Sequence, residues 1–156
     1  MISLDIPGVG SRQWSYLALD LNGTLTVDGE YIPGVPERLQ ALSRSLSVRF
    51  ITADTRGTAS RLVETLGVDW VRVERGQEAE QKRCYIESLG AEQVIAIGNG
   101  NNDASMLSHA SLGIAVLGPE GTASRAILVA DIVAVNIVDA LDLLLKPTRL
   151  LSTLRT

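Results

Sequence analysis

Three polar clusters in this 156-residue chain each follow a short apolar run and hold the side chains best suited to chemistry. The first cluster begins with Asp20, the second begins with Thr52, and the third ends with Asp103. A carboxylate can act as a nucleophile or bind a divalent cation, and a hydroxyl can donate a hydrogen bond to an anionic group. Two residues after Asp20, where a second carboxylate would suit acid–base catalysis, the chain carries Asn22. The sequence therefore places one candidate reactive carboxylate close to an amide.

The elements that must position these residues are short strands that alternate with helices. Strands are expected at residues 16–20, 48–52, 69–73, 94–98, 112–116 and 131–135, and helices at 35–46, 58–67, 77–89, 122–129 and 137–145, with a short helix after residue 103. This alternation predicts an α/β fold, Rossmann-like, with three α/β/α layers and a mainly parallel central sheet. Ligands bind at the carboxyl ends of such strands, so Asp20, Thr52 and Asp103 are expected to converge. Chance is the alternative, because Asp, Asn and Gly are common in loops.

Composition limits the class of protein and its partners. With 46% hydrophobic and 21% charged residues, the chain can bury a core, and its length suits a single domain over residues 1–156. The net charge of -4 argues against nucleic acid or an anionic membrane as an electrostatic partner. Neither a bilayer-spanning apolar run nor a signal peptide is recognisable, so a cytoplasmic protein is expected. The single cysteine excludes an internal disulfide.

Several common functional motifs are incomplete. Gly8 and Gly10 lack the third glycine and the clear preceding strand of a dinucleotide-binding loop. A calcium loop starting at Asp20 would need its glycine at the sixth position, and here it is at the fourth. His109 is the only histidine, which excludes a Ser-His-Asp triad or a multi-histidine metal site. We expect His109 to lie at the end of a helix.

Taken together, the polar clusters resemble the motifs of the haloacid dehalogenase superfamily. Residues 20–26, DLNGTLT, are similar to its DxxGTLT signature, and Thr52, Lys82 and residues 98–103 follow in the order of its other motifs. The last segment, GNGNND, looks like GDGxND with its first Asp replaced by Asn99. The nearer likeness is to the phosphorylation domain of P-type ATPases and to small soluble P-type ATPase-like phosphatases. The resemblance covers nearly the whole chain and implies a Mg²⁺-dependent phosphatase.

The resemblance assigns catalytic roles to four residues: Asp20, Asn22, Thr52 and Lys82. Asp20 would attack phosphorus and form an aspartyl-phosphate. The Thr52 hydroxyl and the Lys82 ammonium would hold phosphoryl oxygens and offset the charge that develops on them. Two of these residues have a structural alternative, because Thr52 can be an ordinary strand-end residue and Lys82 can belong to a solvated helix face in the run EAEQKR.

A Mg²⁺ site and a substrate cradle are also implied by the resemblance. The metal would be held by four residues, with Asn22 using its backbone carbonyl: Asp20, Asn22, Asn99 and Asp103. Substrate would be contacted by three residues: Gly23 and Ala53, through backbone N–H groups, and Asn102. Asp103 has an alternative role as an early helix carboxylate favoured by the helix dipole. Asp54 and Arg56 either touch substrate or form a salt bridge within their loop.

Two asparagines depart from the family pattern. Asn22 stands where phosphatases of the superfamily carry the acid that protonates the leaving group, and such help is worth roughly 10²–10⁴-fold in rate. We therefore expect slow turnover and a long-lived phosphoenzyme. Asn99 replaces a carboxylate that contacts Mg²⁺, so weaker Mg²⁺ affinity is expected. The alternative function is a non-catalytic protein that binds phosphate or Mg²⁺, or regulates a partner, on a degenerate site.

The chain leaves no room for the cap domain that selects substrate in many relatives. Only a hairpin at 26–34, with Asp28-Gly29 as its turn, follows the first motif. Such an open site is expected to be covered by a large phosphorylated substrate or by a neighbouring subunit, and the resemblance favours a homo-oligomer, either a dimer or a tetramer. The tail at 147–156 is expected to be a short helix that packs on the body or on a partner. The identity of the phosphorylated substrate is not encoded in these motifs.

Overall fold

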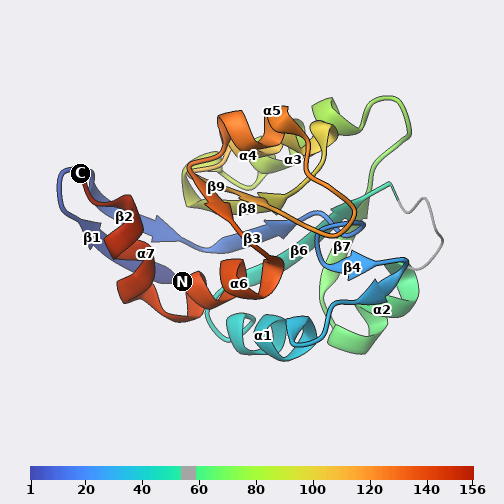
Figure 1. Cartoon of the computed structure of the whole chain (residues 1–156), viewed down its shortest axis with the longest axis horizontal. Coiled ribbons are helices and arrows are strands. Elements are labelled where there is room, and N and C mark those ends of the chain that lie inside the picture. Colours follow the sequence, from blue (N-terminus) through green and yellow to red (C-terminus); the bar gives the residue numbers. More distant parts are fainter. Residues whose placement is uncertain (54–58) are drawn as a thin grey trace.

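A six-stranded parallel sheet forms the centre of the molecule (Figure 1), in the order β10-β9-β8-β3-β6-β7. The computed structural model describes residues 1–53 and 59–156, of which 60–62 and 65 are described by their backbone alone. The expected α/β fold with a mainly parallel sheet is confirmed, because each pair of neighbouring strands is parallel. The strands are β3 (Tyr16–Leu19), β6 (Ser47–Thr52), β7 (Asp69–Arg72), β8 (Val94–Gly98), β9 (Leu112–Val116) and β10 (Ile132–Ala134).

Helices cover both faces of this sheet. One face carries α3 (Glu78–Ser88), α4 (Ala104–His109) and α5 (Ser124–Val129); the other carries α1 (Val35–Leu42), α2 (Ala59–Leu66) and α6 (Ile137–Leu145) (Figure 1). Successive side chains of a strand point to opposite faces. Leu17 and Leu19 therefore join the apolar cluster that contains α1 and α6, whereas Ala18 joins the cluster that contains α3 and α4. His109 ends α4, as expected.

The central strands are apolar throughout because both of their faces are covered. All five residues of β8 and all five of β9 are buried. A strand buried on both faces shows a continuous apolar run and not an alternating pattern. This property is what made the central strands recognisable in the sequence.

An N-terminal hairpin was not predicted from the sequence. β1 (Ile2–Ile6) and β2 (Gly10–Trp14) pair antiparallel and form a separate two-stranded sheet at the opposite end of the molecule from the flap (Figure 1). The expectation that no strand precedes Gly8 is therefore wrong. Gly8 has a φ of 82° and Gly10 a φ of 98°, and they lie in a hairpin turn that leads into β2, not into the helix of a dinucleotide-binding loop.

Two smaller predicted features are confirmed, and one boundary differs. β4 (Thr26–Val27) and β5 (Glu30–Tyr31) form the expected hairpin, which we call the flap, and φ is positive at both turn residues. The tail forms α7 (Pro147–Leu154), which packs on α6 and on β1, with Leu150 buried. The helix expected at 35–46 ends at Leu42, after which Leu46 is still buried in the loop.

Candidate active site

Strand register brings the three polar clusters to one edge of the sheet. Leu19 of β3 is paired with Phe50 of β6 on one side and with Ile97 of β8 on the other. Asp20 follows Leu19 directly, and its backbone N–H donates to the Ile97 carbonyl at 3.0 Å. Thr52 ends β6. The expected convergence at the carboxyl ends of the strands is confirmed for Asp20 and Thr52.

A tight turn after Asp20 presents the first motif. Leu21 and Leu25 are fully buried and anchor the turn in the core. The Leu21 carbonyl accepts hydrogen bonds from the Leu25 N–H at 2.9 Å and from the Thr26 hydroxyl at 3.2 Å. Because both ends of the turn are fixed, the polar side chains between them are held at the sheet edge.

Lys82 is the centre of a buried charge cluster. Its ammonium Nζ lies 2.6 Å from Asp20 Oδ1 and 2.5 Å from Asp103 Oδ1. Only 1% of the Lys82 side chain is exposed, so the solvated-face alternative is wrong. Ile86, four residues later on α3, is also buried. Positions four apart share a helix face, so Lys82 and Ile86 together define the face of α3 that meets the sheet.

Asp103 belongs to the cluster, and both of its oxygens receive hydrogen bonds from the protein. Oδ1 accepts from Lys82, while Oδ2 accepts from the backbone N–H groups of Asn99 at 3.0 Å and Gly100 at 2.8 Å. Gly98 is required for this approach, because a Cβ at that position would lie 2.6 Å from Asp103 Cγ. Asp103 therefore fixes both Lys82 and the turn that carries Asn99.

The opposite side of Asp20 is lined by amides and a hydroxyl. Thr24 Oγ1 lies 3.2 Å from Asp20 Oδ2 and 2.9 Å from Asn99 Oδ1. The Asn99 amide nitrogen donates to the Gly121 carbonyl at 2.9 Å, which orients the amide oxygen toward Thr24. Asn22 Oδ1 is buried and has no hydrogen-bond partner among the described residues. Such an unsatisfied buried acceptor costs about 1–3 kcal/mol.

Burial and neighbouring charges shift the pKa of the central groups. Burial raises the pKa of Asp20 to about 6, and the Asp103 charge adds to this, although Lys82 and Thr24 oppose it. Burial alone would lower the pKa of Lys82, but Asp20 and Asp103 outweigh it and raise that pKa above its usual value. The ammonium is therefore retained, and the ionised form of Asp20 depends on it.

The predicted substrate-contacting residues are not all placed as expected. Gly23 has a φ of 79°, and a Cβ there would lie 2.8 Å from Asn99 Nδ2, so glycine is required. Its N–H already donates to the Thr26 carbonyl at 3.0 Å, which corrects the expectation of a free phosphate donor. Ala53 is half-buried and lines a hollow with Val73. Asn102 lines a different hollow, beside the N-terminus of α3.

Two predicted residues lie outside the described part of the chain, and one contact near the site was not predicted from the sequence. Asp54 and Arg56 fall outside the described residues. Glu120, in the loop between β9 and α5, was not predicted to matter. Its Oε1 accepts from the N–H of Asp28 in the flap turn at 3.0 Å, and its other oxygen would lie 3.3 Å from a Cβ on Gly23. No motif signals this contact, because it depends on how two loops fold together.

The donor set around Asp20 fits a hard cation. No group of three or more histidine, cysteine or acidic side chains in the described ranges could hold a metal ion. The available groups are the Asp20 carboxylate, the Asn99 amide oxygen and the unsatisfied Asn22 oxygen. Mg²⁺ takes oxygen ligands and is commonly held by one or two carboxylates together with water, whereas zinc prefers histidine and cysteine. The residues present therefore fit Mg²⁺.

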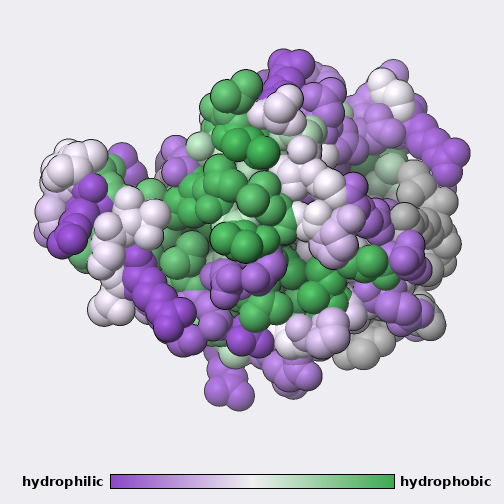
Figure 2. All heavy atoms as spheres, viewed as in Figure 1, coloured by the Kyte–Doolittle hydropathy of each residue, from purple (hydrophilic) through white to green (hydrophobic). Residues whose placement is uncertain are grey.

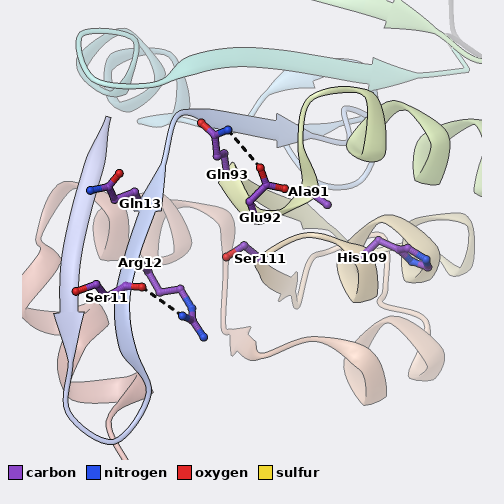
Figure 3. A pocket seen from close by; sticks show the side chains of 8 residues that line it. All are labelled: Ser11, Arg12, Gln13, Ala91, Glu92, Gln93, His109 and Ser111. Atoms are coloured by element: carbon purple, nitrogen blue, oxygen red, sulfur yellow. Dashed lines mark hydrogen bonds between the residues drawn. The ribbon is translucent and has the colours of Figure 1, made fainter.

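A larger hollow at the amino edge of the sheet carries no comparable chemistry. Its volume is about 830 Å³, and β2, η1 (Ala91–Gln93) and α4 supply its lining. Figure 3 shows that its side chains do not converge on one point. Arg12 donates to the Ser11 carbonyl and Gln93 donates to Glu92, and both of these side-chain contacts join sequence neighbours. Despite its volume, this hollow is therefore not a candidate functional site.

Helices within the described part of the chain are all too short or too polar to cross a membrane.

Comparison with known proteins agrees with the geometry. Residues 78–133 match a family model described as haloacid dehalogenase-like hydrolase. An uncharacterized protein of Methanocaldococcus jannaschii is 49% identical over 88 residues, which are 54% of this chain and 95% of that protein. The probable copper-transporting ATPase PacS of Synechocystis sp. is 32% identical over 108 residues, which are 66% of this chain but 14% of the pump.

A solved structure shares the fold over most of its length. The 3-deoxy-D-manno-octulosonate 8-phosphate phosphatase of Moraxella catarrhalis, in complex with magnesium, phosphate and the sugar acid, aligns with a TM-score of 0.68 and 21% identity. The alignment covers 85% of this chain and 86% of that chain. With the motif order, the sheet topology and the buried lysine, these matches show that the chain belongs to the haloacid dehalogenase superfamily and is related to the P-type ATPases.

Proposed function

We propose that this protein is a Mg²⁺-dependent phosphohydrolase that accepts a phosphoryl group on Asp20. The observation that carries the proposal is the Lys82 ammonium, fully buried and held 2.6 Å from Asp20 at the carboxyl edge of the sheet. A lysine kept charged in the interior, next to a carboxylate on a strand end, is an arrangement that structural stability alone does not require. It suits the stabilisation of an anionic group at that edge.

The proposed reaction has two steps at the same carboxylate. A carboxylate oxygen of Asp20 attacks phosphorus, and the ester P–O bond breaks with its electron pair leaving on the departing oxygen. Water then attacks phosphorus of the aspartyl-phosphate, the bond from phosphorus to the Asp20 oxygen breaks, and inorganic phosphate and the free carboxylate are restored. Thr52, at the adjacent strand end, and Lys82 would contact phosphoryl oxygens.

Mg²⁺ would be held by Asp20, by the Asn99 amide oxygen and by Asn22, through its backbone carbonyl with the unsatisfied side-chain oxygen beside it, and it would offset the repulsion between the carboxylate and the phosphoryl group. Asp103 is assigned a different role from a direct ligand. Its oxygens already accept from Lys82, Asn99 and Gly100, so it positions the lysine and the metal-binding turn. Ala53 N–H is the remaining backbone donor proposed for the phosphate cradle.

Asn22 explains why turnover is expected to be slow. An amide cannot give a proton to the leaving oxygen or take one from the attacking water. General acid–base help of this kind is worth roughly 10²–10⁴-fold. The phosphoenzyme is therefore expected to persist, and weakly basic leaving groups are expected to react best.

Phosphoryl transfer to Asp20 can be tested directly. The protein is incubated with acetyl phosphate or 4-nitrophenyl phosphate, with and without Mg²⁺, and its intact mass is measured. A Mg²⁺-dependent phosphoryl adduct that is absent from the Asp20→Asn variant supports the proposal. Mg²⁺-dependent binding of inorganic phosphate without any adduct would instead support a non-catalytic binding protein, the second candidate, which the two asparagines favour.

The roles of the asparagines give the first quantitative prediction. Asn22→Asp should speed hydrolysis of the phosphoenzyme by at least about 10²-fold, because it restores a proton donor and acceptor. Asn99→Asp should tighten Mg²⁺ binding, because it adds one negative charge to the site. Single-turnover dephosphorylation rates and Mg²⁺ titrations of both single variants and the double variant measure these effects. A double variant that hydrolyses aryl phosphate no faster than the wild type would contradict this account.

A further inference from the structure

An apolar pocket adjoins the candidate active site. Its volume is about 350 Å³, near the lower end of the range for small-molecule sites. One wall is the flap and the other is the loop that follows β9. Six of its apolar lining residues are Val27, Ile32 and Pro33 on the flap side and Val116, Leu117 and Pro119 on the loop side.

The pocket shares a wall with the nucleophile. Thr24 lines it, and the hydroxyl of Thr24 lies 3.2 Å from Asp20 Oδ2. Gly118, in the opposite wall, approaches Gly23 so closely that a Cβ on Gly118 would lie 2.9 Å from the Gly23 carbonyl oxygen. A group bound in this pocket is therefore within a few ångströms of the residues that surround Asp20.

The walls of the pocket are tied to each other and to the site. Glu120 of the loop accepts from the flap N–H of Asp28 at 3.0 Å. Further along the same loop, the Ala123 N–H donates to the Asn99 carbonyl at 2.8 Å. The flap, the loop and the candidate metal-binding turn are thus joined by hydrogen bonds, so the pocket is formed without a bound ligand.

The surroundings of the pocket favour an uncharged, apolar occupant. Among the described residues that line the pocket, one, Glu30, is charged and the others are uncharged. The neighbouring edge of the sheet is apolar as well, with Val133 and Val135 exposed on it. Figure 2 shows hydrophobic atoms gathered over β10 and again toward the flap. A polyhydroxylated group would find few hydrogen-bond partners in such a pocket.

We propose that this pocket binds the apolar part of the substrate, and that the substrates are phosphate monoesters of uncharged phenols. The inference rests on the proposed function and adds a substrate class to it. A second observation supports the same class. Because Asn22 cannot protonate the leaving oxygen, the leaving group must be a weak base, and an aryl oxide is weaker than an alkoxide. In the first step the aryl oxide takes the electron pair of the broken P–O bond and then a proton from water.

The test compares two phosphoryl donors that both have good leaving groups. 1-Naphthyl phosphate carries a ring system that reaches into the pocket, whereas acetyl phosphate is too small to fill it. Leu117→Trp fills the pocket from its rim, and Val27→Asn places an uncharged polar group on its opposite wall. Leu128→Trp, at an exposed apolar position on α5 outside the pocket, is the matched control.

The expected result is a change in the ratio of the two activities. Leu117→Trp and Val27→Asn should each lower kcat/KM for 1-naphthyl phosphate by about tenfold or more and leave kcat/KM for acetyl phosphate within about twofold. Leu128→Trp should change neither value. If phosphoenzyme forms from acetyl phosphate but both pocket variants leave the ratio unchanged, or lower both activities equally, the substrate class is wrong while the proposed function stands. If neither donor yields phosphoenzyme, the proposed function fails and the substrate class fails with it.

Discussion

The charge clusters around Lys82 and around Asp142 each have three members and opposite arrangements. In the candidate active site, one ammonium lies between two carboxylates, with Lys82 at 2.6 Å from Asp20 and 2.5 Å from Asp103. Between α1 and α6, one carboxylate lies between two cations, with Asp142 at 2.8 Å from both Arg38 and Lys146. The contact distances are similar, so the clusters differ in the arrangement of their charges and in the burial of the partner side chains.

The difference shows what burial and neighbouring charges together do to the pKa of a carboxylate. Burial is the largest cause that raises the pKa of Asp20 to about 6. The Asp142 side chain is 14% exposed, close to the 11% of Asp20, but its partners Arg38 and Lys146 are 28% and 48% exposed. Hydrogen bonds from Arg38 and then Lys146 lower the pKa of Asp142 to about 2. An apolar replacement of a buried ion cluster is often as stable as the cluster itself, so the buried charges are better explained by chemistry than by stability.

The net charge of the buried cluster is negative, whereas that of the cluster around Asp142 is positive. Two carboxylates against one ammonium leave a single negative charge around Asp20, whereas two cations against one carboxylate leave a positive charge around Asp142. A negative charge that is withdrawn from water attracts a cation strongly. The site is therefore suited to Mg²⁺ even though it lacks a carboxylate at Asn99.

Among these variants, the largest loss of stability is expected when the central ammonium of the buried cluster is removed. Lys82→Met should lower the free energy of unfolding by about 3–5 kcal/mol, because it leaves two buried carboxylates facing each other. Urea unfolding at neutral pH measures this loss. The double variant Lys82→Met/Asp103→Asn should recover part of it, since one of the unpaired charges is removed. A single variant as stable as the wild type would show that the carboxylates do not depend on Lys82.

A smaller effect is expected on the amide side of the site. Thr24→Val removes the hydroxyl that lies between Asp20 Oδ2 and Asn99 Oδ1, and it should lower the free energy of unfolding by about 1–3 kcal/mol. Thr24→Ser should retain most of the stability, because it keeps the donor. Equal losses in the two variants would contradict a role of the hydroxyl, because Thr24→Ser keeps that group and Thr24→Val removes it. Thermal and urea unfolding of the pair separate these cases.

These clusters also show how far the sequence could predict the site. Asp20 was recognisable because it ends an apolar strand, and the parallel topology then predicted its approach to Thr52 and Asp103. The burial of Lys82 was left open, because α3 is polar overall and only Ile86 marks its inward face. The contact of Glu120 with the flap was not predictable, since it joins residues 92 positions apart through two loops.

The fold shows the same division between local and long-range signals. Central strands were predicted because both of their faces are buried, which produces long apolar runs. The N-terminal hairpin was missed because it pairs only with itself and alternates buried Ile2 and Ile6 with exposed Ser3 and Asp5. Its buried face packs on α7, at the other end of the chain, and no local sequence pattern predicts that contact.

The smallest expected effect belongs to the cluster around Asp142 and depends on pH. Asp142→Asn should lower the free energy of unfolding by about 1 kcal/mol at pH 7, because the ionised carboxylate holds Arg38 and Lys146 and this gain is reduced by solvent. The pKa of Asp142 is lowered in the folded state, so its contribution is complete above the usual aspartate pKa of about 4 and is lost as the pH falls toward 2. Urea unfolding at pH 7, 5, 4 and 3 should therefore show the free energies of unfolding of the wild type and the variant approaching each other as the solution becomes more acidic.

In an Arg38→Gln background, the difference in free energy of unfolding that Asp142→Asn causes should already be smaller at pH 7. A gap that stays constant from pH 7 to pH 3 would mean that Asp142 acts through packing and not through its charge, and the contrast with the buried cluster would then no longer rest on electrostatics.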